Sequence, residues 1–138
     1  MIEMKELTVE AVVENIKVVT AFVDEQLEVL LCPMKAQMQI DIAIDELFGN
    51  IVNYAYGTTT GNATVRMEVQ EKPLAVILTF IDQGIPYDPL KKEDPDISLS
   101  AEEREIGGLG IFMVKKTMDD ISYEYSNGKN ILSIKKNI

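Results

Sequence analysis

The chain has 138 residues, of which 46% are hydrophobic, and its formal net charge is −10. This length and composition fit one compact domain with its own core, and they exclude a disordered chain. The acidic balance argues against nonspecific binding of nucleic acid or of an anionic membrane surface through a basic face. We therefore expect no nucleic-acid partner and no membrane partner.

The residue types narrow the possible chemistry further. The chain contains no histidine, which excludes a Ser-His-Asp or Cys-His nucleophile system and a histidine-ligated metal. Its single cysteine, Cys32, cannot form an intramolecular disulfide. No apolar run approaches the roughly 20 residues of a membrane span, and no signal peptide is visible, so we expect a cytoplasmic location.

The first part of the chain predicts one strand followed by two helices. Residues 2–9 alternate weakly between apolar and polar types, which is typical of a short strand. Apolar residues then recur at helical spacing from about Val12 to Leu31, which predicts a helix. Pro33 ends this helix. A second helix is predicted from about Met34 to Tyr56, and Gly57 with the following "TTTGN" indicates a turn.

Two strands are predicted next, over residues 63–70 and 74–82. The first alternates and contains β-branched residues, and the second is almost continuously apolar, as in a strand buried on both faces. The stretch from Gln83 to Gly110 has no sustained period and holds four of the eight glycines. A stretch this long without a period predicts a functional lid, at about residues 88–107.

The last part of the chain predicts a helix and a hairpin. The helix covers residues 109–120, with Leu109, Phe112, Met113 and Met118 as candidate core residues. Strands over residues 121–126 and 129–136 flank Asn127 and Gly128, a pair that suits a type I′ turn. The element order predicts a single domain over residues 1–138, a two-layer α/β sandwich with helices on one face of a mostly antiparallel mixed sheet.

The first candidate site lies on the second helix. Glu46, Asn50 and Asn53 fall within roughly 60° of the helix circumference, opposite the apolar face. Asparagine is a poor helix former, because its amide competes for nearby backbone groups. Its oxygen can ligate a hard cation such as Mg²⁺, and the carboxylate can accept a proton from a hydroxyl. The ordinary alternative is a solvated helix face.

The second candidate site follows the apolar strand, in "IDQGIPYDP". Asp82 ends the strand, where a carboxylate is a fixed acceptor for an amino group on a base. Gly84 allows a ligand to approach the backbone closely. The ordinary alternative is a simple Asp-x-Gly turn.

The third candidate site is "EREIGGLGIFMV", where Gly107, Gly108 and Gly110 lead directly into a helix. Backbone N–H groups at a glycine-rich helix N-terminus can bind an anion. The stretch is neither a Walker P-loop nor a Rossmann fingerprint, because no Gly-Lys-Ser/Thr follows and no βαβ order surrounds it. A flexible hinge is the ordinary alternative.

Taken in order, these motifs resemble a known family. The stretches "DELFGNIVNYAYG", "FIDQGIPYDP" and "EREIGGLGIFMVKKTMDDISYEY", with the closing "GKNILSIKK", resemble the ATP-binding fold shared by gyrase, the heat-shock chaperones and histidine kinases. This is the GHKL, Bergerat or histidine-kinase-like ATPase fold, and the match covers nearly the whole chain. Within it, the chain looks most like the small stand-alone anti-sigma-factor serine/threonine kinases.

The resemblance implies roles for individual residues. Asn50 would ligate Mg²⁺ that bridges the ATP phosphates, and Glu46 would be the general base that activates the attacking hydroxyl. Asp82 would accept a hydrogen bond from the adenine amino group, with Gly84 beside it. Further nucleotide contacts are implied at the remaining motif positions, namely Asn53, Pro86, Arg104, Gly107, Gly108, Leu109 and Gly110. Two residues depart from the family pattern, Tyr54 in place of a common histidine and Pro86 in place of a common second glycine.

The resemblance also implies a function. The chain would phosphorylate a small anti-sigma-factor antagonist protein, sequester a sigma factor and form a homodimer. An ATP-binding regulatory module without kinase activity is the alternative, and Glu46 favours the kinase because binding alone needs no base. A separate piece of a two-component histidine kinase is disfavoured, since the chain has no histidine.

Overall fold

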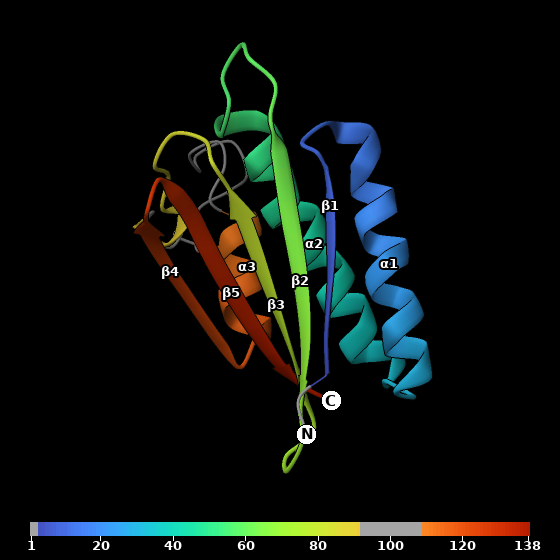
Figure 1. The fold of residues 1–138 in the computed structure, drawn as a ribbon. Coiled ribbons are helices and arrows are strands. Elements are labelled where there is room, and N and C mark those ends of the chain that lie inside the picture. Colours follow the sequence, from blue (N-terminus) through green and yellow to red (C-terminus); the bar gives the residue numbers. More distant parts are fainter. Residues whose placement is uncertain (1–2, 92–108) are drawn as a thin grey trace.

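The computed structural model describes residues 3–91 and 109–138, and in them three α-helices cover one face of a five-stranded sheet (Figure 1). The elements in chain order are β1 (Glu3–Glu10), η1 (Val13–Asn15), α1 (Ile16–Val29), α2 (Met34–Tyr54), β2 (Asn62–Gln70), β3 (Ala75–Asp82), η2 (Pro89–Lys91), α3 (Leu109–Thr117), β4 (Asp120–Ser126) and β5 (Lys129–Asn137). This confirms the expected two-layer α/β sandwich.

The sheet has the strand order β1-β2-β3-β5-β4, and each of its four neighbouring pairs is antiparallel. The expected mixed sheet is therefore wrong for the described strands. Two hairpin connections join β2 to β3 and β4 to β5. The connection through α1 and α2 joins the antiparallel neighbours β1 and β2, whereas the connection through α3 joins β3 to β4, which run in the same direction on either side of β5.

The core lies between the helices and the covered face of the sheet. The predicted apolar face of α2 is confirmed, because its residues are all at most 8% exposed: Ile40, Ile44, Leu47, Phe48, Ile51 and Ala55. From α1, Val19, Val23 and Leu27 are fully buried. The burial of these side chains stabilises the layer by roughly 1.5–3 kcal/mol for each large aliphatic residue.

Two helix predictions need correction. A 3₁₀ turn over Val13–Asn15 precedes α1, so the helix begins at Ile16 and not at Val12. On α3, the buried residues of the helix and its end are Ile111, Val114 and Met118, while Met113 is 45% exposed. The expected core position of Met113 is wrong, because the buried face of α3 runs through Ile111 and Val114.

Phe112 is also not a core residue. Its ring is half-buried and lies beneath the Lys116 ammonium, which is 5.4 Å from the ring centroid. Apolar residues occupy several faces of this short helix, so the sequence pattern did not distinguish its buried face.

The predicted hairpin turn is confirmed. Asn127 has φ of 53° and Gly128 has φ of 76°, the positive values that a type I′ turn requires at both positions. The turn fixes the register of β5 against β4. In the pairing of β5 with its other neighbour, β3, Asn130 lies directly opposite Asp82.

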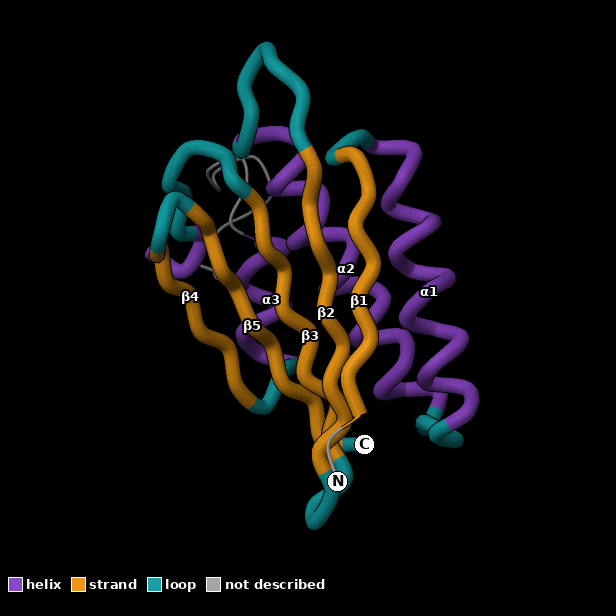
Figure 2. The backbone as a smooth tube through the Cα atoms, viewed as in Figure 1, coloured by secondary structure: helices purple, strands orange, loops and turns teal. Residues whose placement is uncertain are grey.

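The loops after α2 and β3 lie at the same end of the sheet (Figure 2). The hairpin between β4 and β5 turns at this end too, so the second and third quarters of the chain meet its C-terminal part there. Of the predicted lid, only residues 88–91 are described, including the short η2; its remainder lies outside the described residues. No described helix is both long and apolar enough to cross a membrane.

Candidate functional site

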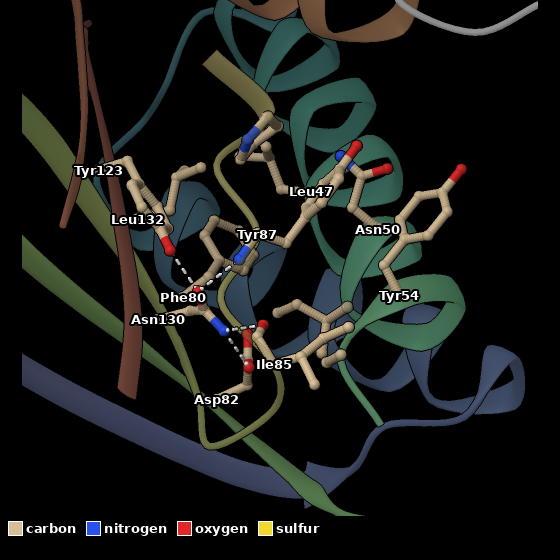
Figure 3. Close-up of a pocket in the computed structure, with 13 residues that line it drawn as sticks. Leu47, Asn50, Tyr54, Phe80, Asp82, Ile85, Tyr87, Tyr123, Asn130 and Leu132 are labelled. Atoms are coloured by element: carbon tan, nitrogen blue, oxygen red, sulfur yellow. Dashed lines mark hydrogen bonds between the residues drawn. The ribbon is translucent and has the colours of Figure 1, made fainter. Parts of the chain in front are cut away.

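A pocket opens at this end of the sheet, between the C-terminal half of α2, the end of β3 and the β4–β5 hairpin (Figure 3). Apolar side chains form most of its wall, including Leu47, Phe80 and Leu132. A few polar side chains also line it, which is the usual construction of a small-molecule site. These polar residues are Asn50, Tyr54, Asp82, Tyr87, Tyr123 and Asn130.

Asp82 is the buried carboxylate of this pocket, with 5% of its surface exposed. Its Oδ1 accepts hydrogen bonds from the Gly84 backbone N–H and from Asn130 Nδ2, both at 2.9 Å. Two donors on one oxygen hold the carboxylate in a single orientation. Asp82 can therefore act as a fixed acceptor in the pocket.

Gly84 is required by close packing on the end of α2. A Cβ at this position would overlap the backbone carbonyl of Ala55, and the Ile85 N–H donates to that same carbonyl at 2.8 Å. The Gln83 N–H donates to the Tyr56 hydroxyl at 2.9 Å. The turn after Asp82 is thus attached to the helix that carries Asn50.

Asn130 is a site residue that the sequence analysis missed, as it also missed Tyr87 and Tyr123. It is 6% exposed, and its Nδ2 donates to Asp82 Oδ1 and, at 2.8 Å, to the Ile85 carbonyl. Its Oδ1 accepts from the Tyr87 N–H at 3.0 Å and from the Tyr123 hydroxyl. The sequence did contain a signal, because Asn130 shares the inward alternation of Leu132 and Ile134, where a polar residue needs partners.

Tyrosines form another part of the pocket. The rings of Tyr54 and Tyr87 stack, with centroids 4.8 Å apart and an angle of 27° between their planes. Burial is the main cause that raises the pKa of Tyr123 above its ordinary value, opposed by a hydrogen bond with the Tyr87 backbone. The Tyr123 hydroxyl therefore stays protonated at neutral pH and donates to Asn130.

The predicted residues of α2 occupy different positions. Asn50 lines the pocket and is half-buried, whereas Asn53 is exposed and does not line it. Glu46 is half-buried one turn before Asn50, and its carboxylate lies against Gly110, where a Cβ would overlap it. The structure therefore brings the start of α3 next to the carboxylate of Glu46.

Of the other predicted site residues, the structure describes some and not others. Pro86 is exposed and Leu109 begins α3. Arg104, Gly107 and Gly108 lie outside the described residues. Within the described part of the chain, no three His, Cys, Asp or Glu side chains gather as a metal site. A cation at Asn50 would therefore need most of its ligands from a phosphate group and water, which is the usual arrangement for Mg²⁺.

A comparison with known protein families assigns the chain to a family. The family described as Histidine kinase-like ATPase domain matches residues 9–136. The chain belongs to this family. The match confirms the resemblance inferred from the three motifs.

Individual relatives agree with this assignment. The chain is 32% identical over 101 residues to the serine-protein kinase RsbW of Listeria monocytogenes, a match that covers 70% of this chain and 63% of that protein. It is 27% identical over 101 residues to the serine/threonine-protein kinase BtrW of Bordetella bronchiseptica, covering 72% of this chain and 70% of that protein. The match thus spans less than two thirds of this RsbW relative's length.

A solved structure confirms the fold. The crystal structure of the RsbU and RsbW domains of Rv1364c from Mycobacterium tuberculosis superposes with a TM-score of 0.69 at 17% identity. The similar region covers 98% of this chain and 32% of that one.

Proposed function

We propose that this chain is an ATP-dependent protein serine/threonine kinase that acts in the cytoplasm as an anti-sigma regulatory factor. The observation that carries the proposal is the position of Glu46 and Asn50, adjacent on one face of α2, at the side of a pocket that also contains the buried Asp82. Membership of an ATPase family and the names of the serine-kinase relatives support it.

Each residue has a distinct task in this proposal. Asp82 accepts a hydrogen bond from the adenine amino group, and the Gly84 turn keeps the base close to the backbone. Asn50 would hold Mg²⁺ through its amide oxygen, and phosphates and water would supply the remaining ligands. ATP would supply the phosphoryl group, and Mg²⁺ would neutralise part of the negative charge on the phosphates.

Glu46 would receive the proton of the attacking hydroxyl as the general base. The hydroxyl belongs to a serine or threonine of a small anti-sigma-factor antagonist protein, and the same chain sequesters a sigma factor when that antagonist is absent. Asn53, Pro86, Arg104, Gly107, Gly108, Leu109 and Gly110 complete the nucleotide site in this proposal.

A homodimer is part of the proposal. Met4 of β1 and Val18 of α1 are 54% and 40% exposed, which leaves apolar surface that a second copy can cover. Light scattering at micromolar concentration should give twice the chain mass of 15.4 kDa. A mass near 15.4 kDa would overturn the dimer alone.

The test of the kinase separates Glu46 from Asn50. Transfer from labelled ATP to a copurified protein partner is measured beside ATP binding. Glu46→Gln should leave ATP binding nearly intact and lower the transfer rate by roughly two to four powers of ten. Asn50→Ala should weaken MgATP binding and abolish transfer together.

Asp45→Asn is the matched control, because it removes an exposed carboxylate beside Glu46. It should leave both binding and transfer unchanged. A wild-type protein that binds ATP and its partner but transfers no phosphate would reject the kinase and leave the alternative, a nucleotide-dependent binding module. Wild-type transfer by Glu46→Gln would reject Glu46 as the base.

A further inference from the structure

The Asn130 side chain uses its full hydrogen-bonding capacity inside the protein. A primary amide offers two donors and two acceptor positions. Asn130 spends the donors on Asp82 Oδ1 and the Ile85 carbonyl, and the acceptor positions on the Tyr87 N–H and the Tyr123 hydroxyl. No capacity remains for a ligand, so Asn130 can act on a ligand only through its neighbours.

The orientation of this amide is determined by its surroundings. The Tyr87 N–H is always a donor and the Ile85 carbonyl is always an acceptor. The oxygen of Asn130 must therefore face Tyr87, and its nitrogen must face Ile85 and Asp82. Figure 3 shows Asn130 between Tyr123 on one side and Asp82 with Ile85 on the other.

We propose that Asn130 is a positioning residue for base recognition: it fixes the Asp82 carboxylate and the Ile85–Tyr87 backbone in the one arrangement that selects an adenine base. This inference rests on the proposed ATP binding. The Asp82 oxygen that receives both internal hydrogen bonds is Oδ1, so the carboxylate is held from one side. The same Asn130 amide holds the wall formed by Ile85 and Tyr87, which both line the pocket.

The test replaces the amide by a carboxylate of the same shape. Asn130→Asp loses both N–H donors and sets a second carboxylate within hydrogen-bond distance of Asp82. Two adjacent carboxylates do not both ionise readily, so they share a proton at low pH. ATP affinity of Asn130→Asp should therefore fall by about tenfold or more at pH 8 and should recover toward the wild-type value near pH 5.5.

Asn127→Asp is the matched control. It makes the same substitution at an exposed position of the same hairpin, and Asp-Gly also suits a type I′ turn. Its ATP affinity should follow the wild-type value at every pH. Thermal unfolding of Asn130→Asp at both pH values is measured in parallel, because a purely structural role would make the loss of ATP affinity follow the loss of folded protein, whereas a positioning role lowers affinity in a protein that is still folded.

Tyr123→Phe provides a second test that does not depend on a new charge. It removes only the hydroxyl that donates to Asn130, and it should weaken ATP binding several-fold while narrowing the preference for ATP over GTP. If Asn130→Asp does not fold, the ATP affinity and the ATP-over-GTP preference of Tyr123→Phe test the positioning role alone.

The outcomes separate the two proposals. A wild-type protein that binds no ATP overturns the proposed function and this inference with it. A wild-type protein that binds ATP, together with Asn130→Asp behaving like Asn127→Asp or Tyr123→Phe keeping wild-type affinity and selectivity, overturns the positioning role alone. A pH-independent loss in Asn130→Asp also overturns it.

Discussion

The two ends of the pocket differ in how completely the protein itself orders them. At the Asp82 end, Gly84 and Asn130 both donate to one carboxylate oxygen, and the turn packs directly on Ala55. At the Asn50 end, no hydrogen bond between residues of the described part of the chain fixes the Asn50 amide. The described part of the chain therefore orders the Asp82 end, whereas it leaves the Asn50 amide without an internal hydrogen bond.

This difference matches the two tasks that we propose. Base recognition gains from a preordered acceptor, because a rigid site rejects a base with the wrong hydrogen-bonding group. Mg²⁺ takes several of its ligands from phosphates and water, so the protein need supply only a few oxygens there, such as the half-buried Asn50 amide.

The largest expected effect comes from disrupting the ordered end with Gly84→Ala. The new methyl group would overlap the Ala55 backbone, which cannot move without displacing the end of α2. Overpacking of this kind costs roughly 1–3 kcal/mol of unfolding free energy. ATP affinity should fall by about 10- to 100-fold through the displaced Asp82, as measured by calorimetry. Unchanged affinity would show that the turn does not order the site.

Disrupting the other end with Gly110→Ala should give a different pattern. The new methyl group would overlap the Glu46 carboxylate, which is the far end of a flexible side chain and can move away. We expect a loss of phosphate transfer of about tenfold or more, without the loss of stability seen for Gly84→Ala. Transfer assays and thermal unfolding test this together. Equal losses of stability in the two variants would remove the contrast between the ends.

The contact between α1 and α2 differs from both ends of the pocket, because two buried carboxylate oxygens there lack a hydrogen-bond donor. Asp24 Oδ1 and Asp41 Oδ1 are both buried and have no hydrogen-bond partner unless a proton lies between them. Burial, followed by hydrogen bonding to and repulsion from Asp24, raises the pKa of Asp41 from 3.8 to about 7. Between about pH 4 and pH 7, the Asp41 carboxyl therefore keeps its proton in the folded chain, whereas it has lost that proton in the unfolded chain.

The sign of the pH dependence follows from this uptake. The contribution of Asp41 to stability is fully present below pH 4 and is lost as the pH rises toward and through 7. Because Asp41 is only half-buried, solvent reduces the effect, and we expect about 1–2 kcal/mol. Asp41→Asn should remove this decline between pH 4 and 8 in urea titrations, whereas Asp45→Asn on the same helix should retain it. Parallel curves for Asp41→Asn and the wild type would reject the shared proton.

The smallest expected effect is a gain in stability from Gly49→Ala. A Cβ at this position of α2 meets no atom within 4 Å, in contrast to Gly84. Alanine is favoured over glycine inside a helix by about 0.5–1 kcal/mol. The unfolding free energy should rise by that amount, and a decrease would mean that the outer face of α2 is covered in solution.

The sequence predicted features that depend on local patterns. Periodicity identified the buried face of α2, and the Asn127–Gly128 pair identified the hairpin, because both depend on residues close in the chain. Asp82 and Gly84 stood out for the same reason. Asn130 did not, since its partner Asp82 lies 48 positions away and meets it only through the register of β3 and β5. Met113 was misplaced because α3 is short and apolar on several faces.

The central claim is that the Asp82 end of this pocket holds an adenine base. Calorimetric titration of the wild-type protein with MgATP and MgGTP, repeated with Asp82→Asn, tests it most directly. We predict binding of ATP, clearly weaker binding of GTP, and a loss of about 10- to 100-fold in ATP affinity for Asp82→Asn. Equal affinity for GTP and ATP, or ATP binding that Asp82→Asn leaves unchanged, would contradict the account.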